Sequence, residues 1–185
     1  MTAPKKTSQP ARPTSRKKLT PTQKPIGLQA ELRQTKSFSS LHAEAFLNLV
    51  RTAEQMQHAL HLQLKPYGIT ETQYNSLRIL RGAGPQGLTC AEIGNRLVSQ
   101  DPDITRLLER LERQGMVRRE RGAKDRRIVL TKITGVGQDR LKETDPVVDS
   151  TVHALLSHLS SSQLKTMIDL LERARLFAGP SNPSR

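Results

Sequence analysis

The sequence predicts a mainly α-helical fold with one small β-hairpin, the architecture of a winged helix-turn-helix. Three observations support this prediction. After residue 101, apolar residues fall at helical spacing on one face, at Ile104, Leu107, Leu108 and Leu111. Gly115 then ends the helix, and two short strands are expected around residues 116–119 and 127–131. The link between these strands is strongly basic, so a helix suited to the DNA major groove lies next to a hairpin suited to phosphates or the minor groove.

The composition indicates a polyanionic partner. The formal net charge is +13 and the isoelectric point is about 10.6, which favours nucleic acid or an acidic membrane surface. Aromatic residues make up only 3%, too few for stacking platforms, so duplex DNA is favoured over unpaired RNA. The single cysteine excludes an intramolecular disulfide, and no apolar run is long enough for a membrane span or a signal peptide. We therefore expect a cytoplasmic protein with no membrane partner.

Residues 1–36 are predicted to form a disordered basic tail. The segment contains five prolines, and seven basic residues precede its first acid, Glu31. It therefore buries too little apolar surface to offset the entropy lost on ordering. Such an arm either adds non-specific phosphate contacts or serves only as a solubilising leader. Residues 179–185 are also expected to be disordered, which leaves one domain at 37–178.

A long helix is predicted from Phe38 to Leu64. Apolar residues recur there every three or four positions, and Pro66 ends the helix. Phe46, together with its apolar neighbours at 47 and 50, widens the stripe beyond what one packing partner needs. We therefore expect this helix to contact another subunit as well.

Capping boxes predict three further helix starts, since a Ser or Thr is followed three residues later by Gln or Glu. The pairs are Thr70 with Gln73, Thr89 with Glu92, and Ser160 with Gln163. The second box opens the first helix of the helix-turn-helix, expected at residues 90–97. Between the hairpin and the last box, Thr134 is expected to cap a helix that is kinked at Pro146.

The second helix of the motif is expected to begin with Asp101 as its cap and Pro102 at its first position. Its polar face carries Arg106, Arg110 and Arg113, interspersed with acids. That face could be an ordinary solvated surface with ion pairs three or four residues apart. The hairpin favours DNA instead, because its six cations repel one another and do little for folding stability. They are Arg118, Arg119, Arg121, Lys124, Arg126 and Arg127.

The stretch DITRLLERLERQGMVRRERGAKDRRIVLTKIT resembles the recognition helix and wing of the MarR family of bacterial transcription regulators. Three details carry the resemblance: Thr105-Arg106 before the leucine stripe, the ending Leu111-Glu112-x-x-Gly115, and the triplet Asp125-Arg126-Arg127. The stretch LKPYGITETQYNSLRIL also resembles the family, and the likeness covers about residues 38–176.

The resemblance implies a DNA-binding lobe at 68–134 and a dimerisation layer formed by the helices at 38–66 and 135–177. It also implies that an arginine of the Asp125 triplet reaches the minor groove while the aspartate orients the wing. Two departures stand out. Gly94 replaces the family's usual alanine, which allows close helix approach, and Asp101-Pro102-Asp103 replaces its usual Ser, Gln or Thr. The acids there either cap the helix and pair with Arg106 or accept a hydrogen bond from cytosine N4.

We therefore expect a dimeric, sequence-specific regulator that binds a palindromic operator and acts as a repressor released by a small ligand. The expected DNA-binding residues are Gln100, Thr105, Arg106, Arg110, Arg113, Arg118, Arg121, Lys124, Asp125, Arg126 and Arg127. The resemblance also suggests an aromatic or lipophilic effector near Arg51, His58, Tyr67 and Tyr74. The alternative is a non-specific DNA-coating or architectural protein that uses the same winged helix and basic tail.

Nothing in the sequence indicates an enzyme, a cofactor or a metal site. The five histidines are scattered, and the closest pair, His58 and His61, has no cysteine or carboxylate at ligand spacing. Cys90 starts a helix, where its thiol pKa would be lowered, yet an ordinary helix-start residue is the favoured interpretation.

Overall fold

The computed structural model describes residues 27–99, 103–122, 125 and 127–178. The chain divides between Phe38 and Ser39 into two compact units. In the smaller unit, Leu28–Glu31 forms a single helical turn, α1, in which the Gly27 carbonyl accepts hydrogen bonds from the amides of residues 30 and 31. The prediction of disorder up to residue 36 is therefore wrong here. The average composition of the tail concealed the apolar Leu28, which is buried.

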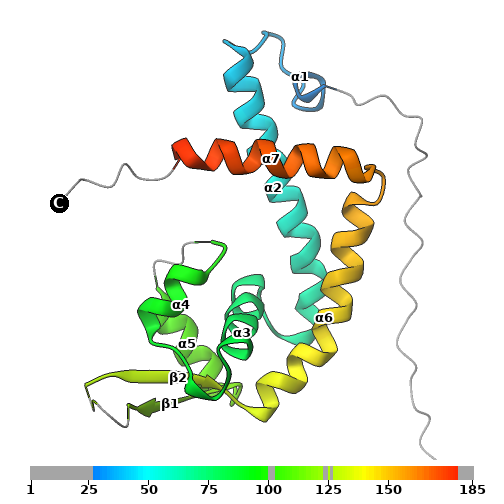
Figure 1. Cartoon of the computed structure of the whole chain (residues 1–185). Coiled ribbons are helices and arrows are strands. Elements are labelled where there is room, and N and C mark those ends of the chain that lie inside the picture. The colour runs from blue at the N-terminus through cyan, green and yellow to red at the C-terminus, as the bar shows by residue number, and fades with distance from the viewer. Residues whose placement is uncertain (1–26, 100–102, 123–124, 126, 179–185) are drawn as a thin grey trace, which may run out of the picture. The chain divides into compact units, whose positions relative to one another are not determined.

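The larger unit is mainly α-helical with one antiparallel hairpin, as predicted (Figure 1). Its elements are α2 (Leu41–Leu64), the 3-10 turn η1 (Lys65–Tyr67), α3 (Glu71–Ala83), the 3-10 turn η2 (Gly84–Gln86), α4 (Cys90–Arg96), α5 (Ile104–Arg113), β1 (Val117–Arg121), β2 (Val129–Ile133), α6 (Gly135–Leu156) and α7 (Ser161–Ala178). Helices α3 to α5 and the hairpin form one lobe, and α2 and α6 run away from it side by side.

Local capping chemistry sets most helix starts. All three predicted capping boxes are present: in the first, the Thr70 amide donates to Gln73 Oε1 at 3.0 Å and the Gln73 amide donates to Thr70 Oγ1 at 3.2 Å. Helix α2 begins three residues later than predicted, because Ser40 accepts a hydrogen bond from the Ala43 amide and so caps it. Its end at Leu64 agrees with the prediction.

The core lies within the lobe and continues along its contact with α6. Its fully buried apolar side chains come from five helices, α2 to α6: Leu64, Leu77, Leu80, Ile93, Leu108, Leu111 and Leu141. Leu77 and Leu80 of α3 are both completely buried. The first half of α2 lies outside this core and keeps several large apolar side chains exposed.

The hairpin pairs Val117 with Ile133 and Arg121 with Val129. Its strands begin and end one or two residues later than predicted, because the turn is closed by hydrogen bonds from the Gly122 amide to Ile128 O and from the Ile128 amide to Asp125 O. Leu88 extends the sheet by pairing with Thr131, at 3.0 and 2.7 Å.

Helix α6 starts at the predicted cap, where Thr134 Oγ1 accepts from the Gly137 amide at 3.2 Å. Pro146 lies inside this helix, and Figure 1 shows the helix changing direction along its length, as the proline predicts. Helix α6 thus leads from the foot of the hairpin to α7.

Candidate nucleic-acid interface

Helix α5 separates a buried apolar face from an exposed cationic one. Leu107, Leu108 and Leu111 are buried, which confirms the predicted stripe. On the opposite side, Arg106, Arg110 and Arg113 are exposed, and 82% of the Arg106 side chain is accessible. Their positive charges therefore lie on a surface that a polyanion can reach.

The start of α5 differs from the prediction. The helix begins at Ile104, and its cap is Asp103, whose Oδ1 accepts from the Arg106 amide at 3.1 Å. Asp101 and Pro102, the predicted cap and first residue, lie outside the described residues, as does Gln100. Two candidate caps two residues apart satisfy the same sequence rule, so the sequence did not distinguish them.

Asp103 makes both of the contacts within the chain that were expected of an acid at this site. Asp103 Oδ2 forms an ion pair with Arg106 Nε at 3.0 Å, so Asp103 both caps the helix and pairs with Arg106. Within the described chain, Glu109 makes no ion pair with either Arg106 or Arg113. Arg106 is therefore paired locally, whereas Arg110 and Arg113 make no ion pair within the described chain.

Gly115 turns the chain from α5 directly into the hairpin. Its φ of 69° is left-handed, and the amides of Gly115 and Met116 donate to Glu112 O at 2.8 Å and Leu111 O at 3.0 Å, which forms a Schellman cap. Thr134 Oγ1 closes the corner by donating to Gly115 O at 2.6 Å. The hairpin is thereby held at a set position beside α5.

Arg119 joins the hairpin to α5, a role the sequence analysis missed. Its Nη2 donates to Thr105 O at 3.3 Å, its amide donates to Glu112 Oε1 at 3.2 Å, and its Nε lies 3.4 Å from Glu112 Oε2. Only 25% of its side chain is exposed. The charge of Arg119 is therefore used to position the wing, and it is less available to DNA than its neighbours.

Glu120 takes up part of the remaining wing charge. It lies 3.1 Å from Arg118 Nε and 2.7 Å from Lys132 Nζ. The hydrogen bond from Lys132, with the nearby charge of Arg118, lowers the pKa of Glu120. Arg118 is therefore partly compensated, whereas Arg121 and Arg127 make no ion pair within the described chain.

Asp125 shapes the turn of the wing, since its Oδ1 accepts from the Arg127 amide at 2.8 Å. Lys124 and Arg126 lie outside the described residues. Of the eleven residues predicted to contact DNA, the eight that are described are all exposed: Thr105, Arg106, Arg110, Arg113, Arg118, Arg121, Asp125 and Arg127. They come from α5, the hairpin and its turn, so one continuous part of the lobe carries them.

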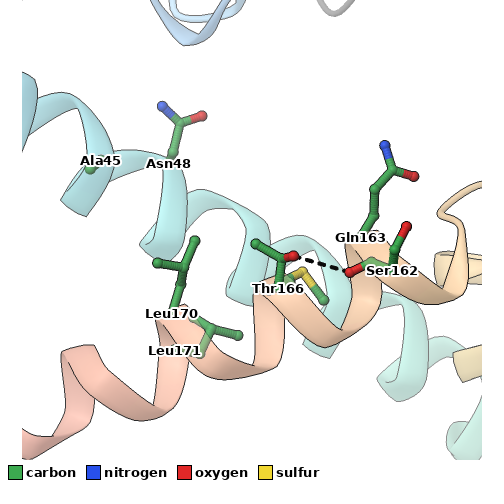
Figure 2. Close-up of a pocket in the computed structure, with 8 residues that line it drawn as sticks. Ala45, Asn48, Ser162, Gln163, Thr166, Leu170 and Leu171 are labelled. Carbon is green, nitrogen blue, oxygen red and sulfur yellow. Dashed lines mark hydrogen bonds between the residues drawn. The ribbon is translucent and has the colours of Figure 1, made fainter.

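The four residues suggested for an effector site differ in their surroundings. Arg51 and His58 are exposed on α2, Tyr67 is half-buried, and Tyr74 is buried. None of them lines either of two cavities in the described chain. The larger cavity, about 640 Å³, lies between α2 and α7 (Figure 2), and the smaller, about 280 Å³, lies beside α5. The effector site stays a prediction.

Tyr74 belongs instead to a polar cluster that ties α3 to α6. Its hydroxyl donates to Asp145 Oδ1 at 2.8 Å, and Arg81 Nη1 donates to Asp145 Oδ2 at 2.6 Å. Burial, with the hydrogen bond to Asp145, raises the pKa of Tyr74 to about 12. Burial alone would raise the pKa of Asp145, but the hydrogen bonds from Arg81 and Tyr74 keep it below its ordinary value. The cluster lies next to Pro146, the proline inside α6.

No three His, Cys, Asp or Glu side chains of the described residues come together as metal ligands. Likewise, none of the described helices combines the length and the hydropathy needed to cross a membrane. Cys90 is half-buried at the start of α4, with its Sγ 3.9 Å from Thr105 Oγ1.

Comparison with known proteins gives a consistent result. The family model described as MarR family matches residues 69–129. The HTH-type transcriptional repressor YetL of Bacillus subtilis (strain 168) is 29% identical over 138 residues, which cover 72% of this chain and 83% of YetL. A crystal structure of a MarR transcription factor from Planctomyces limnophilus is 35% identical, with a TM-score of 0.57, over 74% of this chain and 98% of that one. A mutant of MarR from E. coli complexed with operator DNA is 26% identical, with a TM-score of 0.65, over 74% and 99%.

Proposed function

The chain belongs to the MarR family of transcription regulators, and on that premise we propose that it is a homodimer that recognises a palindromic operator by sequence. As a DNA-binding regulator of this family it is not an enzyme. The observation that carries the proposal is the exposed cationic face of α5, set beside a wing that Arg119 and Gly115 hold in position. A helix presented in this way suits base edges in the major groove.

Exposed apolar side chains on two helices support the dimer. They are Leu41, Phe46, Leu49 and Val50 on α2 and Ile168, Leu170 and Leu176 on α7. Figure 2 shows Leu170 and Leu171 of α7 across the groove from Ala45 and Asn48 of α2. A monomer rarely leaves so much apolar surface in water, so a second copy is the expected partner. Two-fold symmetry then places the half-sites roughly 10 base pairs apart, centre to centre.

Sedimentation tests the dimer. Phe46→Gln should shift the equilibrium toward monomer, because Phe46 is 63% exposed at the proposed interface. Val136→Gln is the matched control, since Val136 is 55% exposed but lies at the start of α6. A wild-type monomer at micromolar concentration that still binds a palindrome tightly would contradict the proposal.

Substituting an arginine on α5 and one in the wing should change DNA binding in different ways. This difference distinguishes a sequence-specific regulator from a non-specific coating protein. Arg106 is the best candidate to donate two hydrogen bonds to a guanine, so Arg106→Ala should cost about 1–3 kcal/mol on the operator and much less on random DNA. Arg127 should contact the backbone or the minor groove, so Arg127→Ala should weaken binding to all sequences and lower the salt slope by about one unit per lost phosphate contact.

The measurement is fluorescence anisotropy at several salt concentrations. The two probes are a duplex selected from a random library by the wild-type protein and a scrambled version of it. Deleting residues 1–36 should weaken binding to both duplexes alike, because a basic arm responds to charge and not to bases. Equal losses on both duplexes for Arg106→Ala would leave a non-specific coating protein as the better account.

The proposal includes that the protein represses transcription and that a small aromatic or lipophilic acid relieves this repression. Its physical requirement is that the ligand prefers one spacing of the two recognition helices in the dimer. Titrating phenolic acids into the complex with the selected duplex tests it, and release of DNA is the expected result. If none of them releases the DNA, a regulator without such a ligand takes its place.

A further inference from the structure

Asp103 holds Arg106 at two points. One carboxylate oxygen accepts from the Arg106 backbone amide at 3.1 Å, and the other lies 3.0 Å from its Nε. A guanidinium has five N–H donors, of which Nε supplies one, so the two terminal nitrogens keep four. The root of this side chain is therefore anchored to the helix start while its terminal fork remains accessible.

Arg106 has room for other orientations. Together with Thr70, Thr72 and Arg110 it lines the cavity of about 280 Å³ between α5 and the start of α3. An unanchored arginine at this place would distribute itself between that cavity and solvent, and DNA binding would have to restrict it. The pair with Asp103 selects one orientation before DNA arrives.

We propose that Asp103 is a positioning residue for base recognition, which holds Arg106 so that both terminal nitrogens face O6 and N7 of one guanine. The inference rests on the proposed function, in which Arg106 contacts the base. Anchoring the side chain in the free protein reduces the ordering cost of binding and makes the contact depend on direction as well as on charge. Both Asp103 oxygens are already engaged within the chain, which disfavours direct recognition of cytosine N4 by Asp103.

The two effects of replacing Asp103, loss of its negative charge and loss of its hold on Arg106, change DNA affinity in opposite directions. A carboxylate close to the phosphates repels DNA, so losing its charge alone should strengthen binding to every sequence. Losing the anchor should instead weaken binding to the selected duplex relative to the scrambled one. The ratio of the two affinities therefore isolates positioning from charge.

The test variant is Asp103→Asn. Asparagine caps helices as well as aspartate does, but its side-chain nitrogen cannot accept a hydrogen bond from Nε. Glu109→Gln is the matched control, since it removes one negative charge from the same exposed helix without touching the partner of Arg106. Both variants of the full chain are titrated by anisotropy with the selected and scrambled duplexes.

Asp103→Asn should lower the affinity ratio by about two- to fivefold, the upper part of the range for an ion pair between exposed groups. Glu109→Gln should leave the ratio unchanged, and Asp103→Asn added to Arg106→Ala should not lower it further. An unchanged or higher ratio for Asp103→Asn overturns the inference. The inference is also overturned if a selection from the random library, repeated with this variant, yields duplexes that have lost a preference for cytosine and kept the preference for guanine. If Arg106→Ala itself leaves the ratio unchanged, the proposed function has failed as well.

Discussion

Removing the Asp145 side chain should destabilise the fold more than its place on a partly exposed helix surface indicates. Asp145 of α6 accepts hydrogen bonds from Tyr74 and Arg81 of α3. Asp145→Ala deletes the only acceptor that the described chain provides for the Tyr74 hydroxyl. It also removes the polar link between α3 of the lobe and α6.

The size of the effect follows from the exposure of the two partners. Tyr74 is only 7% exposed, so leaving its hydroxyl without an acceptor costs about 1–2 kcal/mol. The Arg81 side chain is 40% exposed, so water screens its ion pair and the loss there is about 0–1 kcal/mol. The sum is about 2 kcal/mol, which corresponds to a fall in Tm of roughly 4–8 °C for a domain of this size.

Thermal unfolding at one fixed protein concentration measures this change, because dimerisation makes Tm depend on concentration. Tyr74→Phe is the control. It removes the donor together with its need for an acceptor and should cost less than about 1 kcal/mol. A Tm of Asp145→Ala equal to that of the wild type would refute the reasoning, and so would an equal cost for the two variants.

Three further predictions concern pH and glycines. The pKa of Asp145 is lowered in the fold. The stabilisation that Asp145 contributes is therefore complete above the ordinary carboxyl pKa near 4 and is lost as the pH falls below that value. Acid unfolding should affect the wild type more than Asp145→Asn. The pKa of Tyr74 is raised to about 12. The stabilisation that the Tyr74 hydroxyl contributes is therefore complete below the ordinary tyrosine pKa near 10 and is lost as the pH rises toward 12. Tyr74→Phe should not show this loss of stability in alkaline unfolding. In urea unfolding, Gly94→Ala should stabilise the fold by up to about 1 kcal/mol, because the new Cβ would lie 3.8 Å from its nearest neighbour. Gly137→Ala should destabilise the fold by about 1–3 kcal/mol, because the new Cβ would overlap the Met116 carbonyl oxygen.

At Gly94 the structure differs from what the family resemblance led us to expect. The glycine was expected to allow close packing of two helices, yet a Cβ there would meet its nearest neighbour, in Ile104, at an ordinary contact distance. One glycine that does permit a close approach is Gly137, at the foot of the hairpin, where a Cβ would overlap the Met116 carbonyl oxygen. Which backbone atoms approach a glycine depends on chain segments distant in sequence, so no local pattern distinguishes the two.

The sequence by itself determined the features that depend on neighbours a few residues away. These include the capping boxes, the left-handed Gly115, the apolar stripe of α5 and the end of α2 before Pro66. Each follows from hydrogen bonds or side-chain periodicity within about one helical turn, so the residue types and their spacing suffice to predict it.

Only the tertiary structure decided which charges remain available to DNA and how the lobe is attached. Arg119 is used by Thr105 and Glu112, whereas Arg127 makes no ion pair within the described chain, although both are arginines of one basic hairpin. Asp145 finds its two partners 64 and 71 positions earlier in the chain. An ion pair between distant residues forms only where folding has already brought the two elements together, because exposed pairs contribute too little free energy to direct the fold themselves.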